Sequence, residues 1–174
     1  MRIYPTFFNI FFKGMDPEKA HHVGFWGVQT LRNVGITRAL RKYFQPAPEL
    51  ATTVMGITFP SPFGLAAGFD KGGKGIAALA GIGFGHVEIG TITGQAQPGN
   101  PQPRLFRLVE DKAVINRMGF NNDGAAAAGP RVAAARADLE TEYRGAVRPV
   151  IGVNIGKTKI VELENAIDRK STRL

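Results

Sequence analysis

Phe63-Gly64-Leu65-Ala66-Ala67-Gly68-Phe69-Asp70-Lys71-Gly72-Gly73 is the stretch around which the rest of the chain is interpreted. It begins as a short apolar run after two prolines, which predicts a buried strand of the parallel type. It ends in small residues, whose backbone a flat ligand or a phosphate can approach closely. Lys71 adds a positive charge at the strand end, where ligands bind in α/β proteins. On this stretch alone, a ligand site and an ordinary turn with a solvated lysine are about equally favoured.

A second stretch, Asn116-Arg117-Met118-Gly119-Phe120-Asn121-Asn122, places three amides and an arginine around one glycine. It is too polar for a core and too apolar for a plain linker. Amide side chains beside an approachable backbone suit a planar ligand with carbonyl, NH and carboxylate edges. The second stretch therefore favours a ligand site over an ordinary turn.

The order of the predicted elements indicates an α/β fold with parallel strands. After the first strand we expect a helix over about 74–80 and a second buried strand over 86–91, which together make a right-handed βαβ unit. A third parallel strand is predicted over 149–155. Thr91 and Asn154 then lie at strand ends, as Lys71 does. This is the layout of a (β/α)8 barrel, in which each strand end donates one site residue.

The segments between these strands have their own signals. Residues 53–59 predict an outer strand, and 103–109 with 113–116 predict a hairpin that returns the amide-rich stretch to the strand ends. Asp123 is expected to cap a helix that runs through the alanine-rich stretch to about Glu142.

Residues 1–49 predict two short helices, the second of which starts at Asp16-Pro17-Glu18 with an aspartate N-cap and a first-turn proline. The first helix carries a cluster of phenylalanines, and the second has a broad apolar face flanked by basic residues. Such a face fits either a helix in a membrane interface or one packed on the main domain. Residues 45–49 predict a stiff linker. No apolar run approaches the ~20 residues that span a bilayer, and no signal peptide is convincing.

The composition excludes several classes of protein. The 174 residues contain no cysteine, which rules out a disulfide scaffold, thiol catalysis and Fe–S ligation in this chain. The net charge of +8 suits an anionic ligand or an anionic membrane surface. No nucleic-acid-binding module is visible, so we expect no nucleic-acid partner. We also expect no metal-binding residues.

Several motifs, in order, resemble the dihydroorotate dehydrogenases, specifically the quinone-linked, membrane-associated class. The resemblance runs from about Asp16 to Ile167, and its order and spacing are more specific than any one motif. The matching pieces are Asp16-Pro17-Glu18 with Ala20-His21, Gly64–Lys71, Gly83-Phe84-Gly85, Glu88–Thr91, Gln97–Asn100, Pro103–Leu108, Asn116–Asn121 and Gly152–Lys157.

The resemblance implies FMN as cofactor, dihydroorotate and orotate as substrate and product, and a quinone as acceptor, in pyrimidine biosynthesis. It implies a peripheral protein on the cytoplasmic face of the membrane. The FMN-binding residues it implies are Ala67, Gly68, Phe69, Asp70, Lys71, Thr91 and Asn154. The substrate-binding residues are Lys71, Asn116, Arg117, Met118, Gly119 and Phe120. His21 and Arg107 fall near the quinone head group.

The chain departs from the family in its later part. A (β/α)8 barrel needs at least ~200 residues, and the family's catalytic serine lies in an Asn-x-Ser-Ser-Pro-Asn loop that is absent here. We therefore expect a truncated barrel that is inactive alone. The expected organisation is a membrane-associating segment over 1–49, the first part of the barrel over 50–167, and a non-native tail over 168–174. One DNA sequence that encodes this tail is a common sequencing adapter.

Two alternatives remain open. The first is another FMN- or phosphate-binding barrel enzyme. The second is a non-enzymatic basic fragment that binds membranes.

Overall fold

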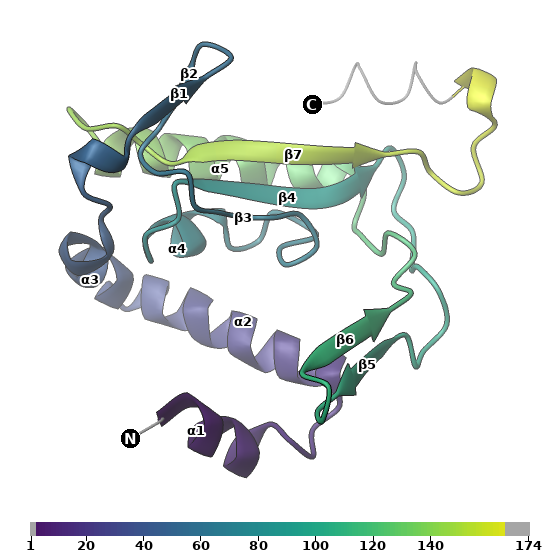
Figure 1. The fold of residues 1–174 in the computed structure, drawn as a ribbon. Helices are drawn as coiled ribbons and strands as arrows, with labels where there is room; N and C mark the ends of the chain where they lie inside the picture. Colours follow the sequence, from purple (N-terminus) through teal and green to yellow (C-terminus); the bar gives the residue numbers. More distant parts are fainter. Residues whose placement is uncertain (1–2, 166–174) are drawn as a thin grey trace.

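A computed structural model of the chain describes residues 3–165 (Figure 1); the expected non-native tail at 168–174 lies outside them. The centre is a parallel sheet in the order β3 (Gly64–Leu65), β4 (His86–Thr93) and β7 (Val150–Gly156). The three predicted parallel strands are confirmed. The first is shorter than predicted because the chain leaves the sheet after Leu65.

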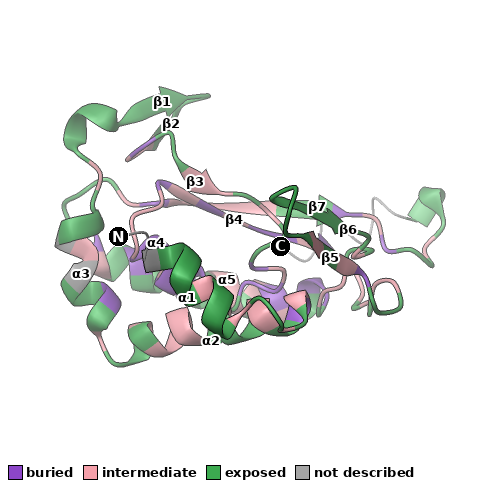
Figure 2. Ribbon diagram, turned by 60° about the horizontal axis from the view of Figure 1, so that its bottom comes forward, coloured by how far each residue is buried: buried purple, intermediate pink, exposed green. Residues whose placement is uncertain are grey.

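Two helices, α4 (Ile76–Ala80) and α5 (Ala125–Glu142), pack beside this sheet and form the core with it. Side chains alternate between the two faces of a strand, so Val87 and Ile89 of β4 point into the core while Glu88 points to the other face. Figure 2 shows buried residues along β4 and on the helices that pack against it. The sheet therefore has one face covered by helices and another that carries polar residues.

The predicted cap of α5 is wrong. Gly124 is at the N-cap position, and no side chain caps the helix there. The Asp123 carboxylate instead forms ion pairs with Lys74 at 2.9 Å and with Arg131 at 2.7 Å. Both partners hold the pKa of Asp123 below its usual value, through hydrogen bonds that outweigh its partial burial.

The N-terminal segment has three described helices rather than the two predicted: α1 (Ile3–Phe11), α2 (Pro17–Asn33) and α3 (Ile36–Phe44). Gly35 separates α2 from α3, with a φ of 81° that favours glycine. The predicted start of α2 is confirmed, because the Asp16 side chain accepts the backbone N–H of Lys19 at 2.9 Å. The linker that follows contains a short 3-10 helix, η1 (Pro48–Leu50).

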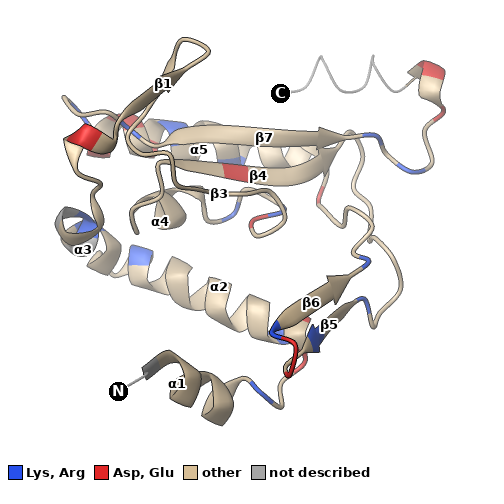
Figure 3. Ribbon diagram, in the orientation of Figure 1, with Lys and Arg blue, Asp and Glu red and all other residues tan. Residues whose placement is uncertain are grey.

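Helix α2 packs on the main domain with one side only. Phe25 and Val28 pack against the core, whereas Trp26 is 67% exposed and Val34, just after the helix, is 64% exposed. Figure 3 shows little charge along α1 and the middle of α2. Within residues 3–165, no helix is both long enough and apolar enough to cross a bilayer. The core thus covers one part of the apolar surface that was expected to lie in a membrane interface, and the other part remains exposed.

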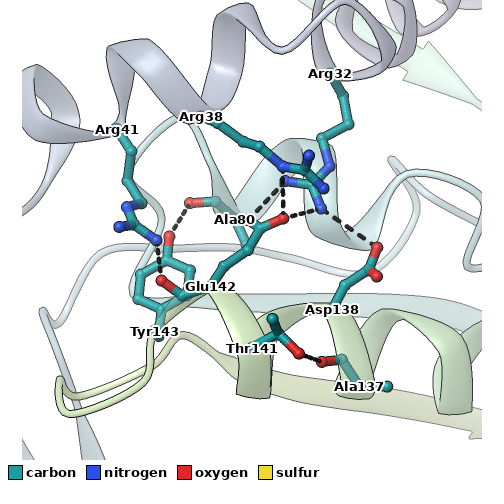
Figure 4. Close-up of polar contacts among 9 residues, drawn as sticks. All are labelled: Arg32, Arg38, Arg41, Ala80, Ala137, Asp138, Thr141, Glu142 and Tyr143. Carbon is teal, nitrogen blue, oxygen red and sulfur yellow. Dashed lines mark hydrogen bonds and ion pairs between the residues drawn. The ribbon is translucent and has the colours of Figure 1, made fainter.

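Arginines of α2 and α3 attach the N-terminal segment to the end of α5 (Figure 4). They converge on Glu142, whose side chain is partly buried. Tyr143, the next residue, donates its hydroxyl to the carbonyl oxygen of Ala80 at 3.2 Å. The helices before the sheet and the long helix between β4 and β7 are therefore held together at one end of the molecule.

Two antiparallel hairpins complete the fold. The predicted outer strand is in fact a hairpin, β1 (Thr52–Val54) and β2 (Ile57–Phe59), because Met55 and Gly56 both adopt positive φ and turn the chain back. The predicted second hairpin is confirmed as β5 (Leu105–Leu108) and β6 (Ala113–Asn116). It lies beside the start of α2 (Figure 1). A 3-10 helix, η2 (Leu163–Asn165), follows β7.

Candidate functional site

A cavity of about 590 Å³ lies where the parallel strands end. The loop after β3 and the ends of β4 and β7 supply Ala67, Gly68, Lys71, Thr91 and Asn154, all predicted site residues. The end of β6 and the loop after it supply four more of the predicted residues, Asn116, Met118, Gly119 and Phe120. The topology thus brings together two stretches that are 45 or more positions apart in the sequence, as expected for a ligand site at the carboxyl ends of parallel strands.

Lys71 is the charged centre of this cavity. Burial lowers the pKa of its ammonium group; the nearby Glu18 carboxylate opposes that shift and Arg104 adds to it. Among the described residues, no carboxylate forms an ion pair with the Lys71 ammonium. A half-buried cation without an anionic partner suits a bound anion.

The loop before Lys71 leaves room beside its backbone. Gly68 has a φ of 106°, and a Cβ added there would meet nothing within 4 Å. The Gly68 N–H donates to the carbonyl oxygen of Gly90 at 2.8 Å, and the Gly90 N–H donates to that of Asp70 at 3.1 Å. These bonds fix the loop over the end of β4. The backbone at Gly68 is therefore both rigidly held and open to a flat ligand.

Thr91 and Asn154 meet at the ends of β4 and β7. The Thr91 hydroxyl donates to Asn154 Oδ1 at 2.8 Å, and Asn154 Nδ2 donates to Glu88 Oε1 at 3.4 Å. Glu88 also accepts the Ala67 N–H at 3.4 Å. Sequence analysis did not select Glu88 as a site residue, although its alternation with the buried Val87 and Ile89 indicates that it faces away from the helices.

Three of the predicted residues lie elsewhere. Asp70 is 1% exposed, and its carboxylate accepts the backbone N–H groups of Lys74 at 2.9 Å and Gly75 at 2.8 Å. Phe69 lines a second cavity, of about 500 Å³. Arg117 donates to the carbonyl oxygen of Pro103 at 3.0 Å. The two bonds that the Asp70 carboxylate accepts thus close the turn before α4.

The two predicted quinone-site residues have different surroundings. His21 lines both cavities, and its ring packs against Phe69 with centroids 4.8 Å apart. Burial, followed by the charge of Lys71, lowers its pKa, so the neutral imidazole is favoured. Arg107 donates to the carbonyl oxygens of Phe12, at 2.8 Å, and Met15, just after α1. The Arg107 guanidinium also lies over the Phe8 ring, 5.4 Å from its centroid.

Sequence analysis missed three further residues. Glu18 and Arg104 form a buried ion pair at the edge of the first cavity. Asn121 lines both cavities, and its Oδ1 is buried without a hydrogen-bond partner among the described residues. The amide-rich motif could have indicated Asn121. No local pattern could have paired Glu18 with Arg104, because they are 86 positions apart.

A family model described as "Dihydroorotate dehydrogenase" matches residues 49–170. Similar curated proteins are named dihydroorotate dehydrogenase (quinone). That of Pseudarthrobacter chlorophenolicus is 68% identical over 97% of this chain and 47% of its own length. That of Arthrobacter sp. strain FB24 is 67% identical over 95% and 46%. The chain therefore spans about half the length of these relatives.

Solved structures agree in fold. The DHODH of Eimeria tenella in complex with ferulenol superposes with a TM-score of 0.74 at 40% identity, over 91% of this chain and 40% of that one. The ligand-free form from the same organism superposes with a TM-score of 0.73 at 39% identity, over 91% and 42%.

Proposed function

The chain belongs to the dihydroorotate dehydrogenase family, and from this we propose that it supplies the substrate pocket and part of the FMN site of a quinone-linked dihydroorotate dehydrogenase. The reaction is the oxidation of dihydroorotate to orotate in pyrimidine biosynthesis. One observation carries the proposal: Lys71 is a half-buried cation, without an ion-pair partner in the described part of the chain, in a cavity lined by amides and glycines.

Orotate and dihydroorotate are flat or nearly flat rings with a carboxylate, and this cavity offers matching groups. In the proposal Lys71 binds the carboxylate and stabilises negative charge that develops during the oxidation. Asn116 would donate to and accept from the ring edges, and the backbone N–H groups of 118–120, which line the same cavity, would bind the carboxylate. Asn121 Oδ1 has no hydrogen-bond partner within residues 3–165, which supports a ligand with an N–H group. Arg117 would act through the loop it holds.

The residues present fit FMN. The open space beside Gly68 supports close approach of a flat ring, and Thr91 and Asn154 supply a hydroxyl and an amide at the strand ends. When bound, FMN would accept the hydride of dihydroorotate. Of the other predicted FMN ligands, Phe69 and Asp70 would act through their backbone, because the Asp70 carboxylate already accepts two backbone N–H groups.

We propose that the catalytic base and the rest of a (β/α)8 barrel come from sequence that this chain does not contain. Ser61 is buried and donates to the carbonyl oxygen of Phe63 at 3.2 Å, which supports a structural role. Among the described strands, β7 pairs along one side only. A barrel would pair its other side with a further strand. The chain alone would then neither hold FMN tightly nor turn over dihydroorotate.

We further propose that residues 1–49 lie on an anionic membrane surface and admit the quinone, with His21 and Arg107 near its head group. The exposed aromatic and aliphatic side chains of α1 and the outer side of α2 support this. His21 lies beside Lys71 at the cavity, so an acceptor could approach from the α2 side. The localisation that follows is peripheral, on the cytoplasmic face of the membrane.

The test joins residues 1–165 in register to the C-terminal part of the Pseudarthrobacter relative; we call this protein the completed enzyme. It should bind FMN and orotate, and dihydroorotate should bleach its flavin absorbance under anaerobic conditions. Residues 1–174 alone should do neither. A flavin reduced by other donors but not by dihydroorotate would favour another FMN-binding barrel enzyme. Stoichiometric FMN and turnover by residues 1–174 alone would contradict the proposed truncation.

A further inference from the structure

Glu18 and Arg104 form a nearly fully hydrogen-bonded buried ion pair. Arg104 Nη2 lies 2.5 Å from Glu18 Oε1, and Arg104 Nε donates to Oε2 at 3.1 Å. Gln102 Nε2 also donates to Oε2, at 3.0 Å. Glu18 is 8% exposed and Arg104 is 9% exposed. Burying two charges is costly, and removing one partner leaves an uncompensated buried charge, so the two side chains hold each other in place.

Arg104 links this pair to the amide-rich loop. Its Nη1 donates to the carbonyl oxygens of Pro98, at 2.6 Å, and Asn100, at 3.0 Å. Asn100 in turn donates its backbone N–H to the carbonyl oxygen of Met118 at 3.0 Å, and its side chain donates to that of Arg117 at 2.7 Å. One guanidinium therefore fixes the loop that holds the backbone of the predicted substrate-binding stretch.

Glu18 links the same pair to Lys71. Glu18 is in the first turn of α2, whose start is fixed by the Asp16 cap, and it lines the cavity together with Lys71 and His21. Among the described residues, the titratable groups that interact electrostatically with Lys71 are the Glu18 carboxylate, the Arg104 guanidinium and the His21 imidazole. Glu18 favours the protonated form of Lys71, whereas Arg104 disfavours it.

We propose that Glu18 and Arg104 are positioning residues of the substrate site: Arg104 holds the 116–122 loop against the start of α2, and Glu18 keeps a negative charge opposite Lys71. This inference rests on the proposed function, since it assumes that the cavity binds orotate. It assigns the start of α2 to the substrate site as well as to the membrane-facing segment. Neither residue need touch the substrate.

Two variants of the completed enzyme separate the two roles. Arg104→Lys keeps the charge but lacks the donors to hold Glu18 and both carbonyl oxygens at once. Glu18→Gln keeps a hydrogen-bonding side chain but removes the negative charge. Each should raise the Kd of orotate about tenfold or more, the scale of one lost hydrogen bond to a charged group. Arg32→Gln is the matched control, because Arg32 joins the same helix to α5 through a part-buried ion pair away from the cavity.

The pH dependence of orotate binding provides a second readout, which would stay unchanged if Glu18 had a merely structural role. Binding should weaken at alkaline pH as Lys71 loses its proton. Glu18→Gln should shift the midpoint of this pH dependence to lower pH, because the charge that favours protonated Lys71 is gone. Arg104→Lys should weaken binding and leave the midpoint in place. If Glu18→Gln fails to hold FMN, Gln102→Ala, which removes one bond to Glu18, should raise the Kd about threefold.

The outcomes distinguish this inference from the proposed function. Parental Kd and midpoint in both Glu18→Gln and Arg104→Lys would overturn the positioning role. An equal rise in Kd for Arg32→Gln would also overturn it, because general loosening of α2 would then explain the effect. Failure of the unsubstituted completed enzyme to bind orotate, or full affinity in Lys71→Ala, would overturn the proposed function instead.

Discussion

Arg32 on α2 and Glu142 at the end of α5 form an ion pair across 110 positions of sequence, with Arg32 Nη1 donating to Glu142 Oε2 at 2.6 Å. Arg38 donates to the other carboxylate oxygen at 2.9 Å, and Arg41 donates to the backbone carbonyl oxygen of Glu142 (Figure 4). Burial raises the pKa of Glu142, but the hydrogen bonds from Arg32 and Arg38 outweigh it, and the net pKa lies below its usual value. Glu142 therefore stays ionised and anchors the N-terminal helices.

Glu142→Gln should destabilise the completed enzyme by about 1–3 kcal/mol, because it leaves the largely buried Arg32 guanidinium and the exposed Arg38 guanidinium with a weaker acceptor. Urea unfolding followed by circular dichroism measures this change. Glu140→Gln is the control, since Glu140 is exposed and its ion pairs in the described part of the chain are surface pairs with Arg136 and Arg148. Equal destabilisation by the two substitutions would contradict the anchoring role.

The stability of the protein should fall in acid through Glu18 and Glu142. Both have a folded-state pKa below the ordinary value of 4.5, Glu18 chiefly through its hydrogen bond from Arg104. A lowered pKa contributes stability that is present above the unfolded-state value and is lost as pH falls through the folded-state value. The melting temperature should therefore decline below about pH 4.5. The melting temperature of the Glu18→Gln variant should decline less steeply as pH falls. An unchanged pH dependence would contradict the contribution assigned to Glu18.

Asp70 and Lys71 are neighbours, but their substitutions should affect different properties of the protein. Asp70→Asn leaves one of two buried backbone N–H groups without a carboxylate oxygen, so it should cost about 1–3 kcal/mol of stability. Lys71→Ala should leave stability almost unchanged and weaken orotate binding by about 1.5–3 kcal/mol. Thermal melting and orotate titration measure the two effects. A stable Asp70→Asn variant, or parental orotate affinity in Lys71→Ala, would count against this division of roles.

Deletion of residues 1–11 should impair use of the quinone acceptor while leaving the substrate site intact. This deletion removes α1 but keeps Glu18, Arg32 and their partners, so the completed enzyme should still bind orotate and reduce its flavin. It should bind anionic vesicles less tightly and reoxidise more slowly with a long-tailed quinone, because exposed apolar side chains of α1 are lost. A soluble quinone analogue is the control acceptor. Unchanged vesicle binding and unchanged long-tailed quinone turnover would argue against a membrane role for α1.

Much of the fold could be predicted because its signals are local. The cap at Asp16, the three parallel strands and the β5–β6 hairpin each depend on residues a few positions apart. Where local signals were ambiguous, the predictions were wrong. Asp123 has the right residue type for a cap, yet Lys74 and Arg131 take its carboxylate in the folded chain. Residues 53–59 have strand character throughout, yet positive φ at Met55 and Gly56 turns them into a hairpin.

The candidate site divides in the same way. The sequence by itself determined which residues could serve a flat anionic ligand: a lysine after small residues and an amide-rich loop, both short motifs whose chemistry does not depend on distant neighbours. Only the tertiary structure decided that the Asp70 carboxylate closes a turn, that Arg107 holds the carbonyl oxygens after α1, and that Glu18 meets Arg104. These contacts join residues far apart in sequence, and their partners are selected by packing and by the cost of burying an unpaired charge.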